Sequence, residues 1–235
     1  MTAQKSKNAP PPPASKQSFM LIGALAIVGA GIMAYLVLKP KGVSIPANVA
    51  VLAADTAGFR GYVIGSENAP IEVTEYADIE CPACAHFDVI DFPVVRKQLI
   101  DAGLIRYRFR DYPLDGAHRH TRIASHAAAC ANDQGKFWEM KARLFETQGD
   151  WSPRGSVGGY FSNIAKEVGL DQAAYDECMA SAKYAGRIEA SLKEGMAVGV
   201  GSTPTFLVEG RLYPGALPSD SLASLVRNLI AAKGQ

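Results

Sequence analysis

Residues 71–84 read IEVTEYADIECPAC and carry the strongest local signals in the chain. Their first part, Ile71–Tyr76, is rich in β-branched residues and alternates in polarity, which predicts a β-strand. The pair Cys81-Pro82-Ala83-Cys84 follows and opens a helical pattern that runs to about Ala102, with a kink expected at Pro93. A strand that leads directly into a Cys-x-x-Cys helix predicts an α/β core.

The place of the two cysteines predicts thiol chemistry. Backbone N–H groups and the dipole at a helix N-terminus favour negative charge, so the Cys81 sulfur should be stabilised as a thiolate. Cys84 lies about one turn further on, so Cys81 should attack and Cys84 should resolve the mixed disulfide. Half of a zinc site and a structural short-loop disulfide are the other interpretations. They are less favoured because no second Cys pair or His pair with metal spacing is present.

The rest of the body continues the α/β pattern. We expect a second strand, a helical block, a β-hairpin and a terminal amphipathic helix at residues 104–111, 118–200, 205–213 and 222–230. The predicted architecture is an α/β core with an all-helical insertion over about 115–198. The second strand carries Arg106, Arg108 and Arg110 on one face. Solvent or acidic groups are expected to cover that face, with an anion site as the less favoured alternative.

A second motif, Gly201-Ser202-Thr203-Pro204-Thr205, stands before the predicted hairpin, about 120 residues after the cysteine pair. Together with the strand, the cysteine pair and the helical insertion, it resembles the DsbA-like thiol–disulfide oxidoreductases of the thioredoxin superfamily, over roughly residues 61–232. The resemblance implies a thioredoxin-like fold in which Pro204 follows a cis bond and lies against the cysteines. It also implies that the Thr203 backbone pairs with an extended substrate segment.

Glu75 matches the buried acid beneath the active-site helix of that family, and the resemblance implies that it relays the proton of Cys84. The alternative for Glu75 is a half-exposed strand carboxylate. The expected catalytic residues are Cys81, Cys84, Pro204, Thr203 and Glu75. No cofactor and no metal ion is expected.

Two features near the cysteine pair bear on the redox direction. Strongly oxidising members of the family carry a histidine between the cysteines, where this chain has Pro82-Ala83. Asp78 and Glu80 also bring negative charge near Cys81, which opposes thiolate formation. Both features predict a weaker oxidant.

Cys130 and Cys178 lie on apolar stripes of two insertion helices. We predict a structural disulfide between them, with two buried free thiols as the alternative. Neither cysteine stands at a helix start, so neither is assigned a catalytic role.

The N-terminal part predicts membrane attachment. We expect a cytoplasmic tail, a transmembrane anchor, a linker and the DsbA-like body at residues 1–18, 19–38, 39–61 and 62–235. Three lysines precede the apolar run and two follow it, which favours a cytoplasmic N-terminus. A cleaved signal peptide is the alternative, and in either case the body is exported. Residues 42–235 carry a net charge of −4, which argues against a nucleic-acid partner.

The sequence therefore predicts a single-pass protein of the cytoplasmic membrane, with a periplasmic or extracytoplasmic domain that forms disulfides in exported proteins. The family resemblance implies reoxidation by a membrane quinone-linked protein. A thiol reductase or isomerase of exported proteins is the alternative within the same chemistry. The alternative from another class is a non-catalytic binding or chaperone subunit that uses the groove beside Pro204.

Overall fold

The computed structural model describes residues 25–33 and 43–234. The chain divides into two compact units, Met1–Lys41 and Gly42–Gln235. Residues 25–33 are helical, but within the described ranges no helix is both long and apolar enough to cross a membrane. Most of the predicted anchor, residues 19–38, and the whole predicted tail, residues 1–18, lie outside the described residues.

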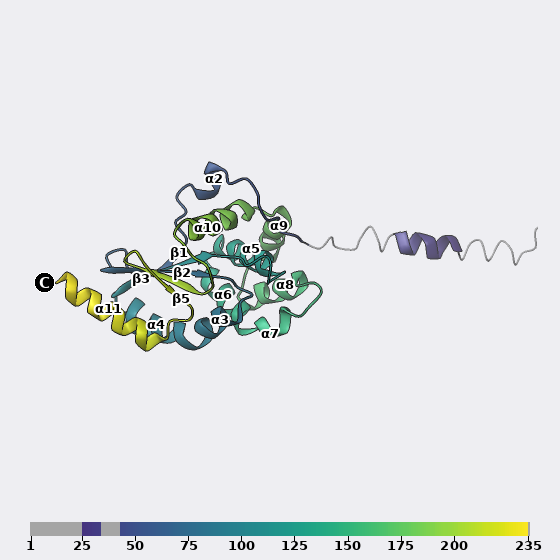
Figure 1. Cartoon of the computed structure of the whole chain (residues 1–235). Helices are drawn as coiled ribbons and strands as arrows, with labels where there is room; N and C mark the ends of the chain where they lie inside the picture. The colour runs from purple at the N-terminus through teal and green to yellow at the C-terminus, as the bar shows by residue number, and fades with distance from the viewer. Residues whose placement is uncertain (1–24, 34–42, 235) are drawn as a thin grey trace, which may run out of the picture. The chain divides into compact units, whose positions relative to one another are not determined.

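The second unit is built on a five-stranded sheet of order β1-β3-β2-β4-β5 (Figure 1). β2 and β3 are parallel and all other neighbours are antiparallel. The strands are β1 (Tyr62–Ile64), β2 (Ile71–Ala77), β3 (Ile105–Asp111), β4 (Thr205–Val208) and β5 (Arg211–Pro214). The thioredoxin-like α/β fold is thus confirmed. The sequence reasoning missed β1, because a three-residue edge strand is too short to show an alternating pattern.

The helical path after the cysteines is one continuous run in four pieces: α3 (Pro82–His86), η1 (Phe87–Asp91), α4 (Phe92–Val95) and η2 (Arg96–Ile100). The predicted single helix is interrupted by the two π-helical turns η1 and η2. Pro93 lies in the first turn of α4. Proline has no N–H to donate to the preceding turn, and the wider turn before it accommodates the missing bond.

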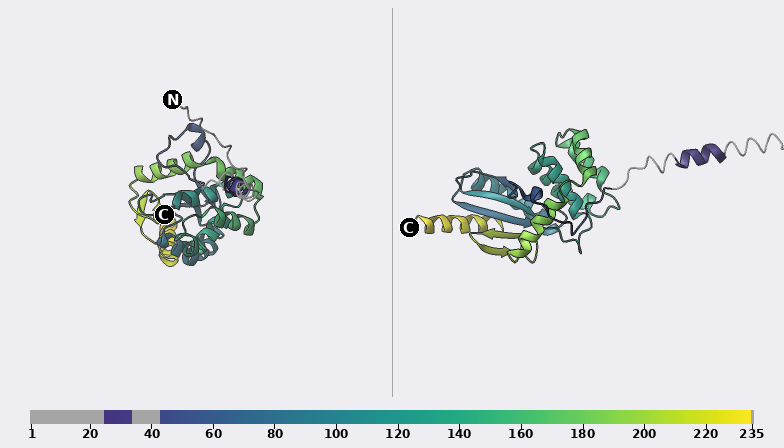
Figure 2. Two further views of the ribbon diagram at one scale, coloured as in Figure 1. Left: turned by 90° about the vertical axis from the view of Figure 1, so that its right-hand side faces the viewer. Right: turned by 90° about the horizontal axis from the view of Figure 1, so that it is seen from above.

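Helices cover both faces of the sheet. The pieces α3 to η2 and the terminal helix α11 (Ser219–Lys233) bury apolar side chains against one face, where Phe87, Leu99 and Val226 meet Ile71 and Val73. α10 (Ala185–Ala197) lies against the opposite face. Figures 1 and 2 show the other insertion helices gathered beyond one end of the sheet. At that end Ala77 and Phe109, from β2 and β3, join the core of the insertion.

The insertion consists of α5 (Thr121–Asn132), α6 (Phe137–Glu146), α7 (Gln148–Trp151), α8 (Gly158–Glu167), α9 (Gln172–Ser181) and α10 (Ala185–Ala197). The Asp171 side chain accepts a hydrogen bond from the N–H of Ala174 and caps α9. A disulfide joins Cys130 on α5 to Cys178 on α9. The predicted disulfide is therefore confirmed, and it links the two helices covalently.

The segment before β1 differs from the predicted linker. From Val43 onward it packs on the insertion, with Ile45 buried and Phe59 half-buried against the same core. It includes the short helix α2 (Ala53–Thr56), and the Asn48 N–H donates to Glu189 of α10. The glycines and prolines prevent a long element here, but the apolar residues between them bury surface. From residue 43 the segment is thus part of the body rather than a free spacer.

Acidic side chains cover the arginine face of β3, as expected. Arg108 forms an ion pair with Glu72 at 3.0 Å, and Arg110 pairs with Glu194 of α10. The Tyr76 hydroxyl also donates to Glu194, at 2.9 Å. Arg110 and Tyr76 therefore join α10 to the sheet.

Candidate active site

The cysteine pair lies at the N-terminus of α3, beside the loop that precedes β4. Cys81 is the N-terminal capping residue and Cys84 lies in the first turn, with Pro82 as the first helical residue. Both thiols are free; Cys81 is 7% exposed and Cys84 is fully buried. This arrangement makes Cys81 the thiol that a partner can reach.

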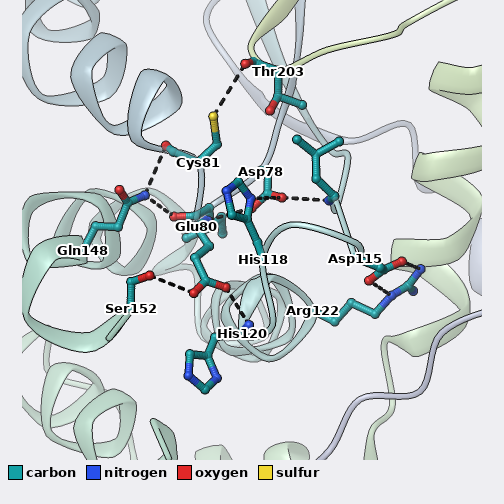
Figure 3. A network of polar contacts seen from close by, with 12 residues as sticks. Asp78, Glu80, Cys81, Asp115, His118, His120, Arg122, Gln148, Ser152 and Thr203 are labelled. Carbon is teal, nitrogen blue, oxygen red and sulfur yellow. Dashed lines mark hydrogen bonds and ion pairs between the residues drawn. The ribbon is translucent and has the colours of Figure 1, made fainter. Parts of the chain in front are cut away.

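Thr203 and Pro204 face this pair from the other side of the site. The Thr203–Pro204 peptide bond is cis, and the Cys81 thiol lies 3.5 Å from the Thr203 carbonyl oxygen (Figure 3). The antiparallel register of Tyr76 with Thr205 brings this loop to the end of β2, where the Cys81 loop begins. The fold thus brings together the two motifs that the sequence analysis singled out.

The two thiols differ strongly in acidity. The pKa of Cys81 is lowered to about 5, chiefly because the Cys84 thiol donates to its sulfur; burial opposes this, and the N–H groups of Ala83 and Cys84 add to it. Burial and the neighbouring Cys81 raise the pKa of Cys84 well above its ordinary value. At neutral pH, Cys81 is a thiolate and Cys84 a thiol. This is the division between attacking and resolving groups that exchange requires.

The expectation that Asp78 and Glu80 destabilise this thiolate is wrong. Asp78 accepts hydrogen bonds from the N–H groups of Glu80 and Leu114, and it pairs with His118 at 2.9 Å. Glu80 accepts bonds from the His120 N–H and from the Ser152 hydroxyl (Figure 3).

Both carboxylates are buried, and each is committed to its own donors rather than to the Cys81 sulfur. Gln148 of α7 donates to the carbonyls of Ile79 and Cys81 and closes the same network. The acids therefore anchor the active-site loop to the insertion.

Glu75 lies on β2, six residues before Cys81, and its side chain is buried. It is 1% exposed, and its carboxylate accepts a 2.7 Å hydrogen bond from the Tyr107 hydroxyl. Burial raises the pKa of Glu75 to about 7, while the positive charge of Lys141 and the Tyr107 bond act in the opposite direction. Glu75 is thus not a half-exposed strand carboxylate. It can bind and release a proton near neutral pH.

The sequence reasoning missed Lys141, a buried lysine close to this acid. Its side chain, on α6, pairs with Asp88 of η1 and lies over the rings of Phe92 and Phe109. Both members of the pair are almost completely buried. The available signal was a lysine four positions after Phe137, on the apolar stripe of a predicted helix.

One group of side chains in the described ranges has metal-ligating atoms close together: His126, Cys130 and Cys178. It contains neither Cys81 nor Cys84. The structure therefore brings together no metal-binding set around the cysteine pair within residues 25–33 and 43–234.

The fold and this site are those of a thioredoxin-like protein with a helical insertion. The family model described as Thioredoxin matches residues 59–228, and the chain belongs to this family.

Among curated relatives, the Na(+)/H(+) antiporter NhaA 1 of Salinispora arenicola is 36% identical over 172 residues, covering 73% of this chain and 25% of the antiporter. The chain thus spans about a quarter of the length of the antiporter relatives that it matches. Disulfide bond formation protein D of Bacillus subtilis is 23% identical over 172 residues, covering 73% of this chain and 78% of that protein. The crystal structure of Wolbachia pipientis α-DsbA1 shares the fold with a TM-score of 0.65 at 22% identity, covering 72% and 90% of the two chains.

The hydrogen bond from Cys84 to Cys81 predicts how Cys84 variants titrate. Cys84→Ala should raise the pKa of Cys81 by about 1–2, because a hydrogen bond to a charged group contributes about 1.5–3 kcal/mol. The ultraviolet absorbance of the thiolate, followed against pH, measures this value. Cys84→Ser is the matched control, since its hydroxyl still donates and should keep the pKa closer to 5. Equal pKa values in the two variants would contradict this origin of the acidity.

The raised pKa of Glu75 predicts a pH-dependent effect on stability. The pKa of a free glutamate is 4.5 and that of Glu75 is about 7. Glu75 therefore contributes its full stability below about pH 4.5 and loses that contribution as the pH rises through 7. Glu75→Gln should raise the free energy of unfolding at pH 8 by up to about 3 kcal/mol and change it little at pH 4.

Urea unfolding at both pH values measures this difference. Glu72→Gln, on the same strand with a side chain 42% exposed, is the control and should show no such dependence. An equal effect of Glu75→Gln at pH 4 and pH 8 would show that the carboxylate of Glu75 is not the titrating group.

Proposed function

We propose that this chain is a membrane-anchored, extracytoplasmic thiol–disulfide oxidoreductase that forms disulfides in exported proteins through Cys81 and Cys84. The observation that carries the proposal is the unequal pair at the start of α3: an accessible thiolate and a buried thiol, beside the Thr203–Pro204 loop. The names of the Bacillus relative and the Wolbachia neighbour point to the same chemistry.

The exchange proceeds in two thiolate attacks. A substrate thiolate attacks the Cys81 sulfur of the oxidised pair, forms the mixed disulfide and displaces Cys84 as a thiolate that takes up a proton. A second substrate thiolate then attacks the substrate sulfur of the mixed disulfide and displaces Cys81 as its thiolate. The substrate loses two electrons and gains a disulfide, and the cysteine pair gains the two electrons. A low pKa makes Cys81 a good leaving group in the second step.

Glu75 is proposed to handle the proton of Cys84. The Cys84 thiolate is displaced into a buried site that strongly favours the protonated thiol, so it needs a nearby proton. With a pKa of about 7, Glu75 can supply that proton and take it back when the pair is reoxidised. Lys141 acts on this step as a positioning residue, since its charge lowers the pKa of Glu75.

Thr203 and Pro204 are proposed to receive the substrate. The Thr203 carbonyl faces the Cys81 sulfur at 3.5 Å, so an extended chain that pairs with the Thr203 backbone would present its cysteine to Cys81. Such pairing gives affinity through main-chain hydrogen bonds, which suits substrates that differ in sequence.

The location is proposed from the N-terminal sequence. Residues 19–38 would anchor the chain in the cytoplasmic membrane, with residues 1–18 in the cytoplasm and the body outside. The Cys130–Cys178 disulfide is typical of an oxidising compartment. The anchor would keep the body near a quinone-linked membrane protein that accepts the electrons from Cys81 and Cys84.

A low pKa of Cys81 favours the oxidase over the reductase alternative. Stabilising the Cys81 thiolate stabilises the reduced protein and so makes the disulfide form a stronger oxidant. The value of about 5 lies between about 7 for thioredoxin and about 3.5 for DsbA. Asp78 and Glu80 are bonded to their own donors and not to the Cys81 sulfur, which also favours the oxidase.

The reduction potential of the Cys81–Cys84 pair tests the proposed direction. The full chain, equilibrated in glutathione buffers, should give a value nearer to about −120 mV, as for a strong oxidant, than to about −270 mV, as for thioredoxin. Cys81→Ser/Cys84→Ser is the control, because it keeps only Cys130 and Cys178 and identifies which pair titrates. A reduction potential of about −270 mV would identify the protein as a reductase. If Cys81 and Cys84 never exchange with glutathione, the proposed enzyme activity is contradicted and the binding or chaperone alternative is favoured.

If Glu75 supplies the proton to Cys84, replacing it should slow the formation of the mixed disulfide. Glu75→Gln should slow formation of the mixed disulfide at pH 7 by about 10²-fold or more, the usual contribution of a positioned acid. Stopped-flow mixing of oxidised protein with a reduced peptide measures the rate, and the dependence on pH around 7 should disappear in the variant. Glu72→Gln is again the control. Unchanged rates and an unchanged pH profile would remove Glu75 from the mechanism.

A further inference from the structure

A second group of sulfur and nitrogen atoms lies in the insertion, between α5 and α9, which Figure 1 shows close together. It consists of His126, Cys130, Cys178 and Met179, which we call the α5–α9 cluster. The side-chain ligand atoms of the histidine and the two cysteines all lie within 4.8 Å of one another. All four residues are buried, and none of them has a part in the exchange proposed for Cys81.

His126 has unusual surroundings for a buried histidine. Its Nδ1 lies 3.4 Å from the Cys130 sulfur and 3.4 Å from the Met179 sulfur. Its Nε2 is buried and has no hydrogen-bond partner among the described residues. A fully buried polar ring is normally held by oxygen or nitrogen partners, whereas here its neighbours are two sulfur atoms. The Nδ1 side of the ring therefore faces sulfur atoms that could ligate a metal ion together with it.

The distances fit a tetrahedral metal site. With metal–nitrogen and metal–sulfur bonds of about 2.0 and 2.3 Å, nitrogen and sulfur ligands of one ion lie about 3.5 Å apart. The two observed separations from His126 Nδ1 are 3.4 Å each. His126 and Cys130 are four residues apart and share one face of α5, while Cys178 and Met179 come from the facing helix.

The donor set selects among metals. Two thiolates and a thioether are soft ligands, and soft sulfur ligands prefer Cu(I). A thioether adds little to the binding of a harder divalent ion such as Zn²⁺.

We propose that the α5–α9 cluster binds one Cu(I) ion when the disulfide between Cys130 and Cys178 is reduced. A dithiol donor breaks the S–S bond by exchange: it gives up two electrons and two protons, becomes a disulfide itself and leaves two thiols in the cluster. Cu(I) then binds both sulfurs as thiolates, together with His126 and Met179, and displaces the two thiol protons. In the oxidised state the two sulfurs bind each other, and the site is closed to the ion.

The surface lies nearest to the α9 side of the cluster. Cys178 is 8% exposed and Met179 5%, whereas His126 and Cys130 are almost completely inaccessible. α9 is short, and Ala182 in a left-handed conformation follows it. Breaking the disulfide removes the covalent link between α9 and α5, and this gives the ion a path into the cluster.

The test uses the full chain with Cys81→Ser/Cys84→Ser, so that the active-site thiols do not bind copper. The variant is reduced by dithiothreitol without oxygen, desalted and titrated with Cu(I) against the chelator bicinchoninate. It should bind one Cu(I) per chain, with sulfur and nitrogen neighbours in the X-ray absorption spectrum. The same variant with its disulfide intact should bind none.

Two further substitutions in the same background test the ligand set. Met179→Leu should weaken Cu(I) binding by at least about tenfold, since even outer partners of metal ligands contribute about 10–100-fold. Met140→Leu, at a buried methionine of α6 outside the cluster, is the matched control and should leave the affinity unchanged. His126→Gln should remove the nitrogen neighbour from the spectrum.

Three results would overturn the proposal. The first is that the reduced variant binds no more Cu(I) than the oxidised one. The second is equal affinity in the Met179→Leu and Met140→Leu variants with no nitrogen neighbour, which would describe a bare dithiol. The third is displacement of bound Cu(I) by equimolar Zn²⁺, which would refute the copper assignment. None of these results depends on the redox role of Cys81 and Cys84.

Discussion

The site depends on the antiparallel pairing of β2 with β4. Because Tyr76 pairs with Thr205, the loop before β4 and the loop after β2 reach the same end of the sheet. Cys81 and Thr203, which are 122 positions apart, therefore meet there. The insertion leaves the sheet after β3 and returns before β4, so its helices can vary without altering this pairing. The thiol chemistry is thus held by the sheet, and the insertion closes the site from the side.

The charged groups around the site form structural contacts, and these contacts help to explain the low pKa of Cys81. Asp78 and Glu80 bind backbone N–H groups and neighbouring side chains, which leaves the Cys84 thiol and the backbone of α3 to set the pKa of Cys81. Beneath them, the buried pair of Lys141 and Asp88 links the insertion to the active-site helix. Removing one member of such a pair costs about 3–5 kcal/mol, because it leaves an uncompensated buried charge. The charge of the same lysine also lowers the pKa of Glu75, which burial raises.

The two cysteine pairs of the chain illustrate how environment decides chemistry. Cys81 stands at a helix start beside a polar loop, and its sulfur is acidic and within reach. Cys130 lies inside α5, is buried, and is joined to Cys178. Exchange with protein partners requires exposure and a low pKa. A buried pair that is reduced in place presents its thiolates to the histidine and methionine beside it.

Local patterns sufficed for β2, β3, the helix after Cys81 and the stripes of the insertion, because periodicity and helix-start chemistry are properties of neighbouring residues. The family resemblance added the cis bond before Pro204 and the burial of Glu75. The sequence alone did not reveal the short strand β1, the packing of residues 43–59 on the insertion, or the burial of Lys141 beside Asp88. It also misjudged Asp78 and Glu80, whose carboxylates accept hydrogen bonds from donors up to 72 positions away. Sequence thus determined which elements form and where the reactive thiols stand, whereas pKa values and ligand sets depend on distances between distant segments, which only the tertiary structure decides.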